Sequence, residues 1–315
     1  DVSALSCLFE DPSVTKVLHG ADYDIRCLFR DFGFTVASLF DTQLAARFLG
    51  QKETGLSSVI SRYFGVDLEK KYQKSNWALR PIPREMLSYA VLDTAFLPEL
   101  RALLSEELEK LGRASWVEEE CGILCQARPS SNGDSPLFLR FKGAGLLDPL
   151  SLAVLEEVLQ VRVGFAKSMD RPVFKVFSDT AALAMAQEKP RNMEALAAIP
   201  NFSGRQIQIF GAKVLAGIEK ALQTPKAELP RYPRKQRFRC SPHEAERKLA
   251  LRDFRDRKAA ELSLDPGIVL TNSQMRAVAK RKRTRLEELS AIPDLRRWQV
   301  SAMGEEMLET LSRVP

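Results

Sequence analysis

The stretch of sequence that decides the fold is Leu87-Ser88-Tyr89-Ala90-Val91-Leu92-Asp93-Thr94-Ala95-Phe96-Leu97. Large apolar residues recur at Leu92, Phe96 and Leu100, the spacing of one helix face, and neither Gly nor Pro interrupts the stretch. Tyr89 and Asp93 then project from the same side of this helix, one turn apart. A carboxylate can hold a cation and a phenol can orient the attacking water, so the pair suits a metal-assisted hydrolase. A surface Asp beside a half-buried Tyr is the alternative interpretation of the same spacing.

The residues that precede this helix predict an α/β domain. Asp22 and Asp41 are expected to cap two helices, and Gly33 is expected to end the first of them. Strands and helices that alternate are typical of an α/β domain, although two short strands make an incomplete sheet. The expected strands are residues 14–19 and 36–40, and the expected helices are residues 22–31, 41–50, 55–64 and, after the opening stretch, one long helix over 97–125.

The second half of the chain predicts two helical bundles. Beyond a polar loop at residues 129–134, helical patterns dominate and strand patterns nearly vanish. The segment Leu196-Ala197-Ala198-Ile199-Pro200-Asn201 recurs 93 residues later as Leu289-Ser290-Ala291-Ile292-Pro293-Asp294. The same offset relates Gly211 to Gly304. We therefore expect two copies of one small helical bundle.

Length and composition limit the class of protein. A chain of 315 residues fits two or three domains. Its five cysteines are an odd number spread along the chain, which argues against a disulfide framework and favours the cytoplasm. No apolar run reaches the length of a membrane span, so an integral membrane protein is not expected. There is no signal-peptide pattern at the start, and the chain begins at Asp1 rather than Met, so we expect a processed form or a piece of a longer protein.

The charge of the chain suggests a polyanionic partner. The formal net charge is +6, and the basic residues gather in the second half. One group lies between the two copies, at residues 225–248, and includes Arg231, Arg234, Lys235, Arg237 and Arg239. Another is Lys280-Arg281-Lys282-Arg283. Exposed basic segments of this kind suggest contact with phosphates.

Several motifs together resemble the ribonuclease D family. Val17-Leu18-His19-Gly20-Ala21-Asp22-Tyr23-Asp24-Ile25 resembles its second exonuclease motif, and Phe40-Asp41-Thr42-Gln43-Leu44-Ala45 resembles the segment that follows. Tyr89-Ala90-Val91-Leu92-Asp93 resembles the third motif in its Tyr-x-x-x-Asp form. The repeated bundles, with Asp170-Arg171-Pro172 and Ile199-Pro200, resemble the helicase-and-RNase-D C-terminal (HRDC) domain. The resemblance covers nearly the whole chain.

This resemblance implies a multidomain fold. It implies an α/β ribonuclease H-like exonuclease domain that lacks its N-terminal strands, followed by two small all-α bundles of the HRDC type. The domain boundaries that we expect are residues 1–115 for the partial exonuclease domain, 116–135 for a helix and linker, 136–224 for the first HRDC domain, 225–245 for a basic linker and 246–315 for a second HRDC-like domain.

The resemblance also implies an activity. It is a 3′→5′ exoribonuclease of the DEDDy type, which trims RNA 3′ ends such as those of tRNA precursors. Four carboxylates hold two divalent cations, Mg²⁺ or Mn²⁺, which activate water and stabilise the leaving oxygen. Carried over to this chain, Asp24 and Asp93 are the metal ligands, and Tyr89 orients the attacking water. The implied protein is a cytoplasmic monomer that binds RNA and no membrane.

One family motif is absent from this sequence. The first motif is an Asp-x-Glu pair on the first strand, and no such pair precedes His19. Asp67-Leu68-Glu69 has the right letters, but it lies in a loop between the second and third motifs, and we interpret it as a solvated turn. We therefore expect weak or absent catalysis from this chain alone, because two carboxylates hold two metals poorly.

Two other functions remain as alternatives. A non-catalytic nucleic-acid-binding protein would use the HRDC domains and the basic linker as a clamp. A DNA-directed proofreading exonuclease would use the same carboxylates on a different substrate.

Overall fold

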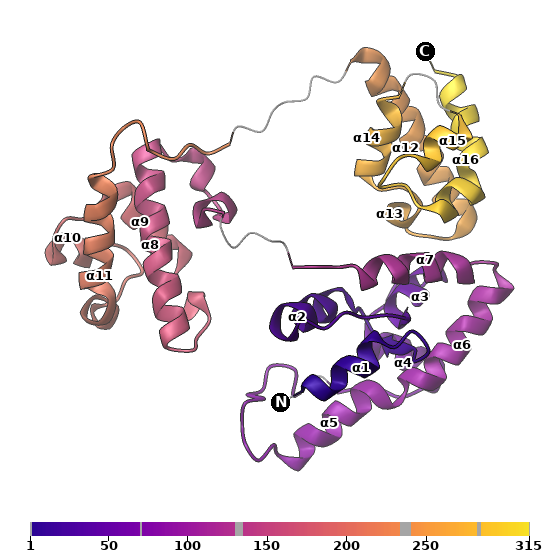
Figure 1. Ribbon diagram of the computed structural model, residues 1–315, viewed down its shortest axis with the longest axis horizontal. Helices are drawn as coiled ribbons and strands as arrows, with labels where there is room; N and C mark the ends of the chain where they lie inside the picture. The colour runs from indigo at the N-terminus through magenta and orange to yellow at the C-terminus, as the bar shows by residue number, and fades with distance from the viewer. Residues whose placement is uncertain (1, 70, 130–134, 234–240, 282–284, 315) are drawn as a thin grey trace. The chain divides into compact units, whose positions relative to one another are not determined.

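The structure is a computed structural model that describes residues 2–69, 71–129, 135–233, 241–281 and 285–314. The chain divides into two compact units (Figure 1). The first unit joins residues 1–130 to residues 239–315, and the second unit is residues 131–238. Part of the predicted loop at 129–134, the linker cations Arg234, Lys235, Arg237 and Arg239, and the pair Lys282 and Arg283 lie outside the described residues.

The first unit begins with a small α/β layer. Strands β1 (Lys16–Leu18) and β2 (Leu39–Asp41) pair in parallel, with Val17 opposite Phe40. Parallel strands need a crossover, and here it contains a helix, α2 (Asp22–Phe32). Around the strands lie one 3₁₀ turn (Ser3–Leu5) and helices α1 (Ser6–Glu10), α3 (Thr42–Phe48) and α4 (Leu56–Phe64). Both predicted strands exist, but they are shorter than predicted, and β2 lies further along the chain.

Three predicted helix signals have different outcomes. Asp41 is the N-cap of α3, and its side chain accepts hydrogen bonds from the backbone N–H groups of Gln43 and Leu44, as predicted. Asp22 is not a cap: Ala21 holds that position, and the Asp22 carboxylate pairs instead with Arg26, one turn along α2, at 2.9 Å. Gly33 ends α2 in the left-handed conformation, with φ of 74°, as predicted.

The prediction of one long helix over residues 97–125 is wrong. The chain forms α5 (Arg84–Ala95), α6 (Leu97–Lys110) and α7 (Ala114–Cys125). Gly112 has φ of +67°, which ends α6 and turns the chain. The apolar face predicted from Leu92, Phe96 and Leu100 is also interrupted, because Leu92 is 44% exposed while Leu100 is fully buried.

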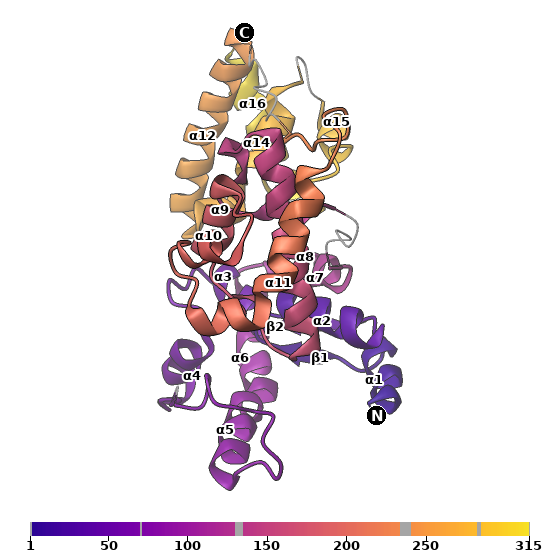
Figure 2. The same cartoon turned by 90° about the vertical axis from the view of Figure 1, so that its left-hand side faces the viewer.

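The second unit is a helical bundle, which we call the first bundle. Its long helices α8 (Pro149–Ser168) and α11 (Gly204–Leu222) lie side by side in both views (Figures 1 and 2). Phe165 packs on Phe210, and Lys220 pairs with Glu157, so the two helices run antiparallel. Helices α9 (Asp179–Glu188) and α10 (Met193–Ala197) and 3₁₀ turns at Leu137–Arg140, Ala144–Leu146 and Val173–Lys175 complete the bundle.

Residues 241–281 and 285–314 form the second bundle. Its elements are α12 (Pro242–Leu262), α13 (Pro266–Val269), α14 (Asn272–Ala279), α15 (Leu286–Ser290) and α16 (Arg297–Ser312). Each begins 93 residues after its counterpart in the first bundle, where the counterpart of α13 is the 3₁₀ turn Val173–Lys175. The internal repeat read from the sequence is therefore confirmed element by element. The exact domain boundaries stay a prediction.

The second bundle shares one hydrophobic core with the N-terminal part of the first unit. Trp298 of α16 stacks on Trp116 of α7, with ring centroids 4.5 Å apart, and meets the Phe48 ring at 5.4 Å. Arg113, which is buried, donates hydrogen bonds of 2.7 Å to the carbonyl oxygens of Phe48 and Leu262. The sequence did not predict this packing. In the described ranges, no helix combines the length and apolar character that crossing a bilayer requires.

Candidate active site

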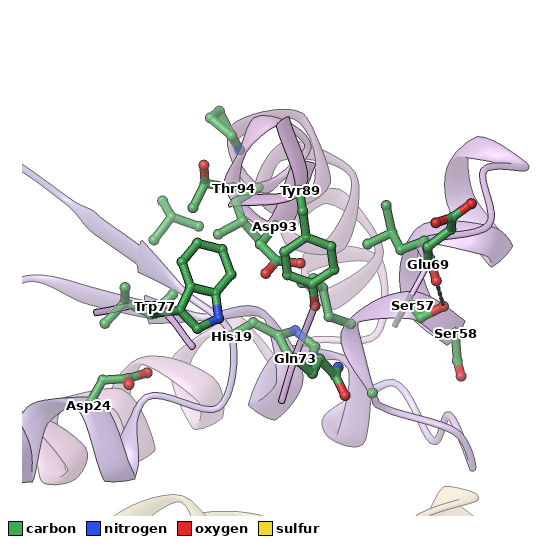
Figure 3. Close-up of a pocket in the computed structure, with 17 residues that line it drawn as sticks. His19, Asp24, Ser57, Ser58, Glu69, Gln73, Trp77, Tyr89, Asp93 and Thr94 are labelled. Atoms are coloured by element: carbon green, nitrogen blue, oxygen red, sulfur yellow. Dashed lines mark hydrogen bonds between the residues drawn. The ribbon is translucent and has the colours of Figure 1, made fainter. Parts of the chain in front are cut away.

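A cavity of about 760 Å³ lies where β1 ends and where α2, α4 and α5 meet (Figure 3). Five of its lining residues carry groups that titrate or bind metals, and they come from four different parts of the chain. They are His19 at the end of β1, Asp24 of α2, Glu69 in the loop after α4, and Tyr89 and Asp93 of α5. The structure therefore brings together all three residues that the sequence singled out.

The Asp41 carboxylate fixes the turn that leads to Asp24. Asp41 is 2% exposed and accepts hydrogen bonds from the N–H groups of Gly20 and Ala21, at 3.0 and 2.7 Å, besides capping α3. Gly20 has φ of +73°, a left-handed backbone conformation that favours glycine. The chain thus leaves β1 and starts α2 in one defined direction, with Asp24 in the first helical turn.

Tyr89 and Asp93 project from one side of α5 into the cavity (Figure 3). The Tyr89 ring packs against two aromatic rings of the preceding loop, with its centroid 6.0 Å from that of Tyr72 and 6.2 Å from that of Trp77. The Trp77 indole N–H donates to the Tyr72 carbonyl oxygen at 3.1 Å, which holds this loop together. The Tyr89 hydroxyl has no hydrogen-bond partner among the described residues, so it is available to a ligand in the cavity.

The two aspartates lack partners for their charge. Burial raises the pKa of the Asp93 carboxyl. Burial also raises the pKa of Asp24, and the negative charge of nearby Asp41 adds to that rise. Within the described residues, neither carboxylate takes part in an ion pair or accepts a hydrogen bond. A bound cation would relieve the burial of either carboxylate. Carboxylate oxygens are also the ligands that Mg²⁺ and Mn²⁺ prefer, so the chemistry of these two residues suits a divalent cation.

His19 is a lining residue that the sequence did not single out for chemistry. Thr42 Oγ1 donates to the Leu18 carbonyl oxygen at 3.1 Å, so the contact of 2.9 Å with His19 Nδ1 makes Nδ1 the donor. His19 Nε2 is then a buried acceptor without a partner among the described residues. Burial lowers the pKa of His19, although Asp41 and the Thr54 backbone oppose the shift. The ring is therefore neutral near pH 7.

Glu69 also lies at the cavity, although the sequence placed it in a solvated turn. It is exposed, and the neighbouring Ser57 hydroxyl donates to the Leu68 carbonyl oxygen at 3.4 Å. Asp67, the other acid of this segment, is turned to Ser61, whose hydroxyl donates to it at 2.9 Å. Across the described ranges, no three His, Cys, Asp or Glu side chains converge on a single metal position. The carboxylates that line the cavity are thus those of Asp24, Glu69 and Asp93, and of these residues Asp24 and Glu69 are exposed while Asp93 is half-buried.

Comparison with protein families assigns both halves of the chain. Residues 1–109 match the family described as 3′-5′ exonuclease. Residues 151–218 and 245–311 each match the HRDC domain, and these two ranges fall on the first and second bundles. The predicted fold class, an exonuclease domain followed by two HRDC bundles, is confirmed.

Relatives extend over most of the chain. Ribonuclease D of Desulfotalea psychrophila is 28% identical over 280 residues, which cover 88% of this chain and 74% of the relative. Ribonuclease D of Pseudomonas paraeruginosa is 29% identical over 306 residues, which cover 96% of this chain and 80% of the relative.

Solved structures share the fold. A protein from Bifidobacterium adolescentis has a TM-score of 0.82 at 24% identity, over 99% of this chain and 84% of that one. Escherichia coli RNase D, described as an exoribonuclease involved in structured RNA processing, has a TM-score of 0.72 at 24% identity, over 100% of this chain and 84% of that one. With its exonuclease domain, its paired HRDC domains and these relatives, the chain belongs to the ribonuclease D family.

Proposed function

We propose that this chain is the catalytic and substrate-binding part of a metal-dependent 3′→5′ exoribonuclease that removes nucleotides from RNA 3′ ends. The observation that carries the proposal is that Asp24, Tyr89 and Asp93 line one cavity, with both carboxylates unpaired among the described residues. The 3′-5′ exonuclease domain and the relatives named ribonuclease D support the same reaction and the same class of substrate.

Each of the three residues has a distinct role in this proposal. Asp24 and Asp93 hold the divalent cations, Mg²⁺ or Mn²⁺, which when bound activate water and stabilise the charge on the leaving 3′ oxygen. Tyr89 donates a hydrogen bond to the attacking water or accepts one from it. Its hydroxyl is available for this because it has no competing partner in the described part of the chain. The aromatic rings of Tyr72 and Trp77 keep the Tyr89 ring in place.

The details of the substrate and the setting are part of the same proposal. We infer that the RNAs are 3′-extended precursors such as those of tRNA, and that the protein acts as a monomer in the cytoplasm. The free thiols of Cys7, Cys27, Cys121 and Cys125 agree with a reducing compartment. Because no Asp-x-Glu pair precedes β1 in this sequence, we expect the 315-residue chain by itself to turn over weakly or not at all.

The experiment uses the protein translated from the full reading frame of the gene, with the 315-residue chain beside it. A 5′-labelled RNA with a single-stranded 3′ tail is incubated with Mg²⁺, Mn²⁺ or EDTA. We expect a ladder of products that shorten one nucleotide at a time, only with metal. No shortening under any metal condition would contradict the proposal and favour the non-catalytic binding protein. Equal or faster degradation of a DNA strand of the same sequence would favour the DNA-directed exonuclease.

A further inference from the structure

Strand β2 has one edge that no other strand covers among the described residues, where the sheet consists of β1 and β2. The Lys16 N–H donates to the Ser38 carbonyl oxygen at 2.8 Å, so this carbonyl faces β1. The C=O and N–H of one trans peptide group point in opposite directions, so the Leu39 N–H faces away from β1, and so does the Asp41 N–H two residues later. Leu39 and Asp41 are buried, so these two N–H groups need hydrogen-bond acceptors from the protein.

Helix α7 supplies the acceptors, and both are thiols. Cys121 Sγ accepts the Asp41 N–H at 3.4 Å. Burial raises the pKa of Cys125, and a hydrogen bond from the Leu39 N–H opposes that rise. Residues two apart on a strand and residues four apart on a helix are both spaced by about 6 to 7 Å, so one turn of α7 matches the two N–H groups of β2. Cys121 and Cys125 thus close this edge of the sheet.

Asp41 links this edge to the first of the two proposed metal ligands. Its backbone N–H is bound by Cys121, and its carboxylate accepts hydrogen bonds from the N–H groups of Gly20 and Ala21, at 3.0 and 2.7 Å. Asp24 follows this turn at once, in the first turn of α2. A shift of the Asp41 backbone would therefore move the turn, and the Asp24 carboxylate would move with it.

Helix α7 is itself fixed by contacts with the second bundle. Glu119 accepts hydrogen bonds from the backbone N–H groups of Arg297 and Trp298, at 2.8 and 2.9 Å, and so satisfies donors at the start of α16. Glu120 accepts a hydrogen bond from the Trp298 indole N–H at 3.1 Å and pairs with Arg296 at 2.9 Å. Because these contacts hold α7 in place, its two thiols hold the edge of β2 in one position.

We propose that Cys121 is a positioning residue for metal binding. Its sulfur holds the backbone of Asp41, and Asp41 holds the turn that presents Asp24 to the cation. Cys125 supports the same strand two residues further from that turn. Without the Cys121 sulfur, a buried N–H would be left unpaired, and because that is costly the end of β2 would shift toward another acceptor. The inference rests on the proposed function for the role of Asp24, and it adds a residue that touches neither the cation nor the RNA.

The test compares Cys121→Ala with Cys121→Ser in the protein translated from the full reading frame. The two substituted side chains have nearly the same volume, but only serine keeps a hydrogen-bond acceptor. Mn²⁺ is titrated into each protein without RNA, and the electron paramagnetic resonance signal of free Mn²⁺ gives Kd. We expect Kd for Mn²⁺ to rise at least about fivefold in Cys121→Ala and to stay within about twofold of the parent in Cys121→Ser, since residues that orient metal ligands change metal affinity by about tenfold or more.

Val117→Ala is the matched control. Val117 lies one turn before Cys121 on α7 and is 2% exposed, so its truncation also removes packing from this helix. Both truncations should lower the thermal unfolding midpoint, but Val117→Ala leaves the Asp41 N–H paired. We therefore expect its Kd for Mn²⁺ within about twofold of the parent. If Val117→Ala weakens Mn²⁺ binding as much as Cys121→Ala does, the effect is a general loss of packing, and the proposal is wrong.

The same titration separates this inference from the proposed function. Asp24→Asn should raise Kd for Mn²⁺ at least as much as Cys121→Ala. If Asp24→Asn weakens binding and Cys121→Ala does not, only the positioning role is wrong. If Cys121→Ser loses as much affinity as Cys121→Ala, the acceptor is not what matters, and the positioning role is again wrong. If Asp24→Asn binds Mn²⁺ like the parent, Asp24 is not a metal ligand, and both proposals fail.

Discussion

Tyr89 allows the proposed chemistry to be tested through a single atom. Its ring packs against Tyr72 and Trp77, while its hydroxyl faces the cavity without a partner among the described residues. Tyr89→Phe therefore keeps the packing and removes only the hydroxyl. In the protein translated from the full reading frame, we expect kcat for RNA shortening to fall at least about tenfold, with the Mn²⁺ concentration for half-maximal rate unchanged. Tyr72→Phe is the control and should stay within about twofold. A change in metal requirement without a change in kcat would argue against the role of Tyr89.

Cys121 gives a prediction that depends on pH. Burial raises the pKa of this thiol to about 12, and its sulfur accepts the Asp41 N–H at 3.4 Å. The unfolded thiol ionises near pH 9 and the folded thiol does not, so this group should reduce the free energy of unfolding as pH rises from about 9 to 12. In the native protein, mass spectrometry after iodoacetamide treatment should find exposed Cys7 modified before buried Cys121. Cys121, which is buried, should stay unmodified until denaturant is added. Labelling of Cys121 in the native state would show that it is not buried.

At the scale of single residues, the sequence predicted more about α5 than about its surroundings. The spacing of Tyr89 and Asp93 sufficed to place both on one side of a helix, because helix geometry is local. Asp24 was selected only through the resemblance to a family. His19 and Glu69 were not selected, because their place at the cavity depends on the pairing of β1 with β2 and on the path of the loop after α4. Neither the strand pairing nor the path of that loop can be predicted from the spacing of residues in the sequence.

At the scale of elements, substitutions at two glycines distinguish the cost of a strained backbone from the cost of a clash with another part of the fold. Gly33 and Gly50 both have positive φ, at 74° and 78°. A β-carbon at Gly33 meets nothing within 4 Å, whereas one at Gly50 collides with the second bundle at Ser263. We expect Gly33→Ala to lower the free energy of unfolding by about 1 kcal/mol, the cost of left-handed backbone. Gly50→Ala should lower it by at least about 3 kcal/mol, because overpacking is added. Urea denaturation of the two variants measures both changes in the free energy of unfolding. Equal losses of stability in Gly33→Ala and Gly50→Ala would contradict the docking of the second bundle.

Element boundaries show where sequence patterns are sufficient. Asp41 and Gly33 mark the start of α3 and the end of α2 through their own backbone chemistry, so both were predictable. The break between α6 and α7 was missed because the apolar spacing continues across Gly112. The turn at Gly112 is held in place by the next residue, Arg113, whose two hydrogen bonds reach Phe48 and Leu262. Both partners are distant in the sequence.

At the scale of the whole molecule, the offset of 93 residues predicted two bundles but not their different surroundings. The second bundle shares a core with the exonuclease domain through Trp298 and Trp116, whereas the first bundle is a separate unit. From the sequence alone, each tryptophan is expected only to be a buried apolar residue of its own helix. The stacking of Trp298 on Trp116 joins segments that are far apart in the sequence, so no local pattern predicts it.

The central claim is that carboxylates of α2 and α5 hold the metals that hydrolyse RNA. The most direct measurement is Mn²⁺-dependent shortening of a 3′-tailed RNA by the protein from the full reading frame, compared among three variants. Asp22 lies two residues before Asp24 on the same helix, is exposed and pairs with Arg26, so Asp22→Asn is the matched control. We predict that Asp24→Asn and Asp93→Asn each lower kcat/KM at least about a hundredfold, while Asp22→Asn stays within about twofold. Activity of Asp24→Asn or Asp93→Asn within about threefold of the parent would contradict the account.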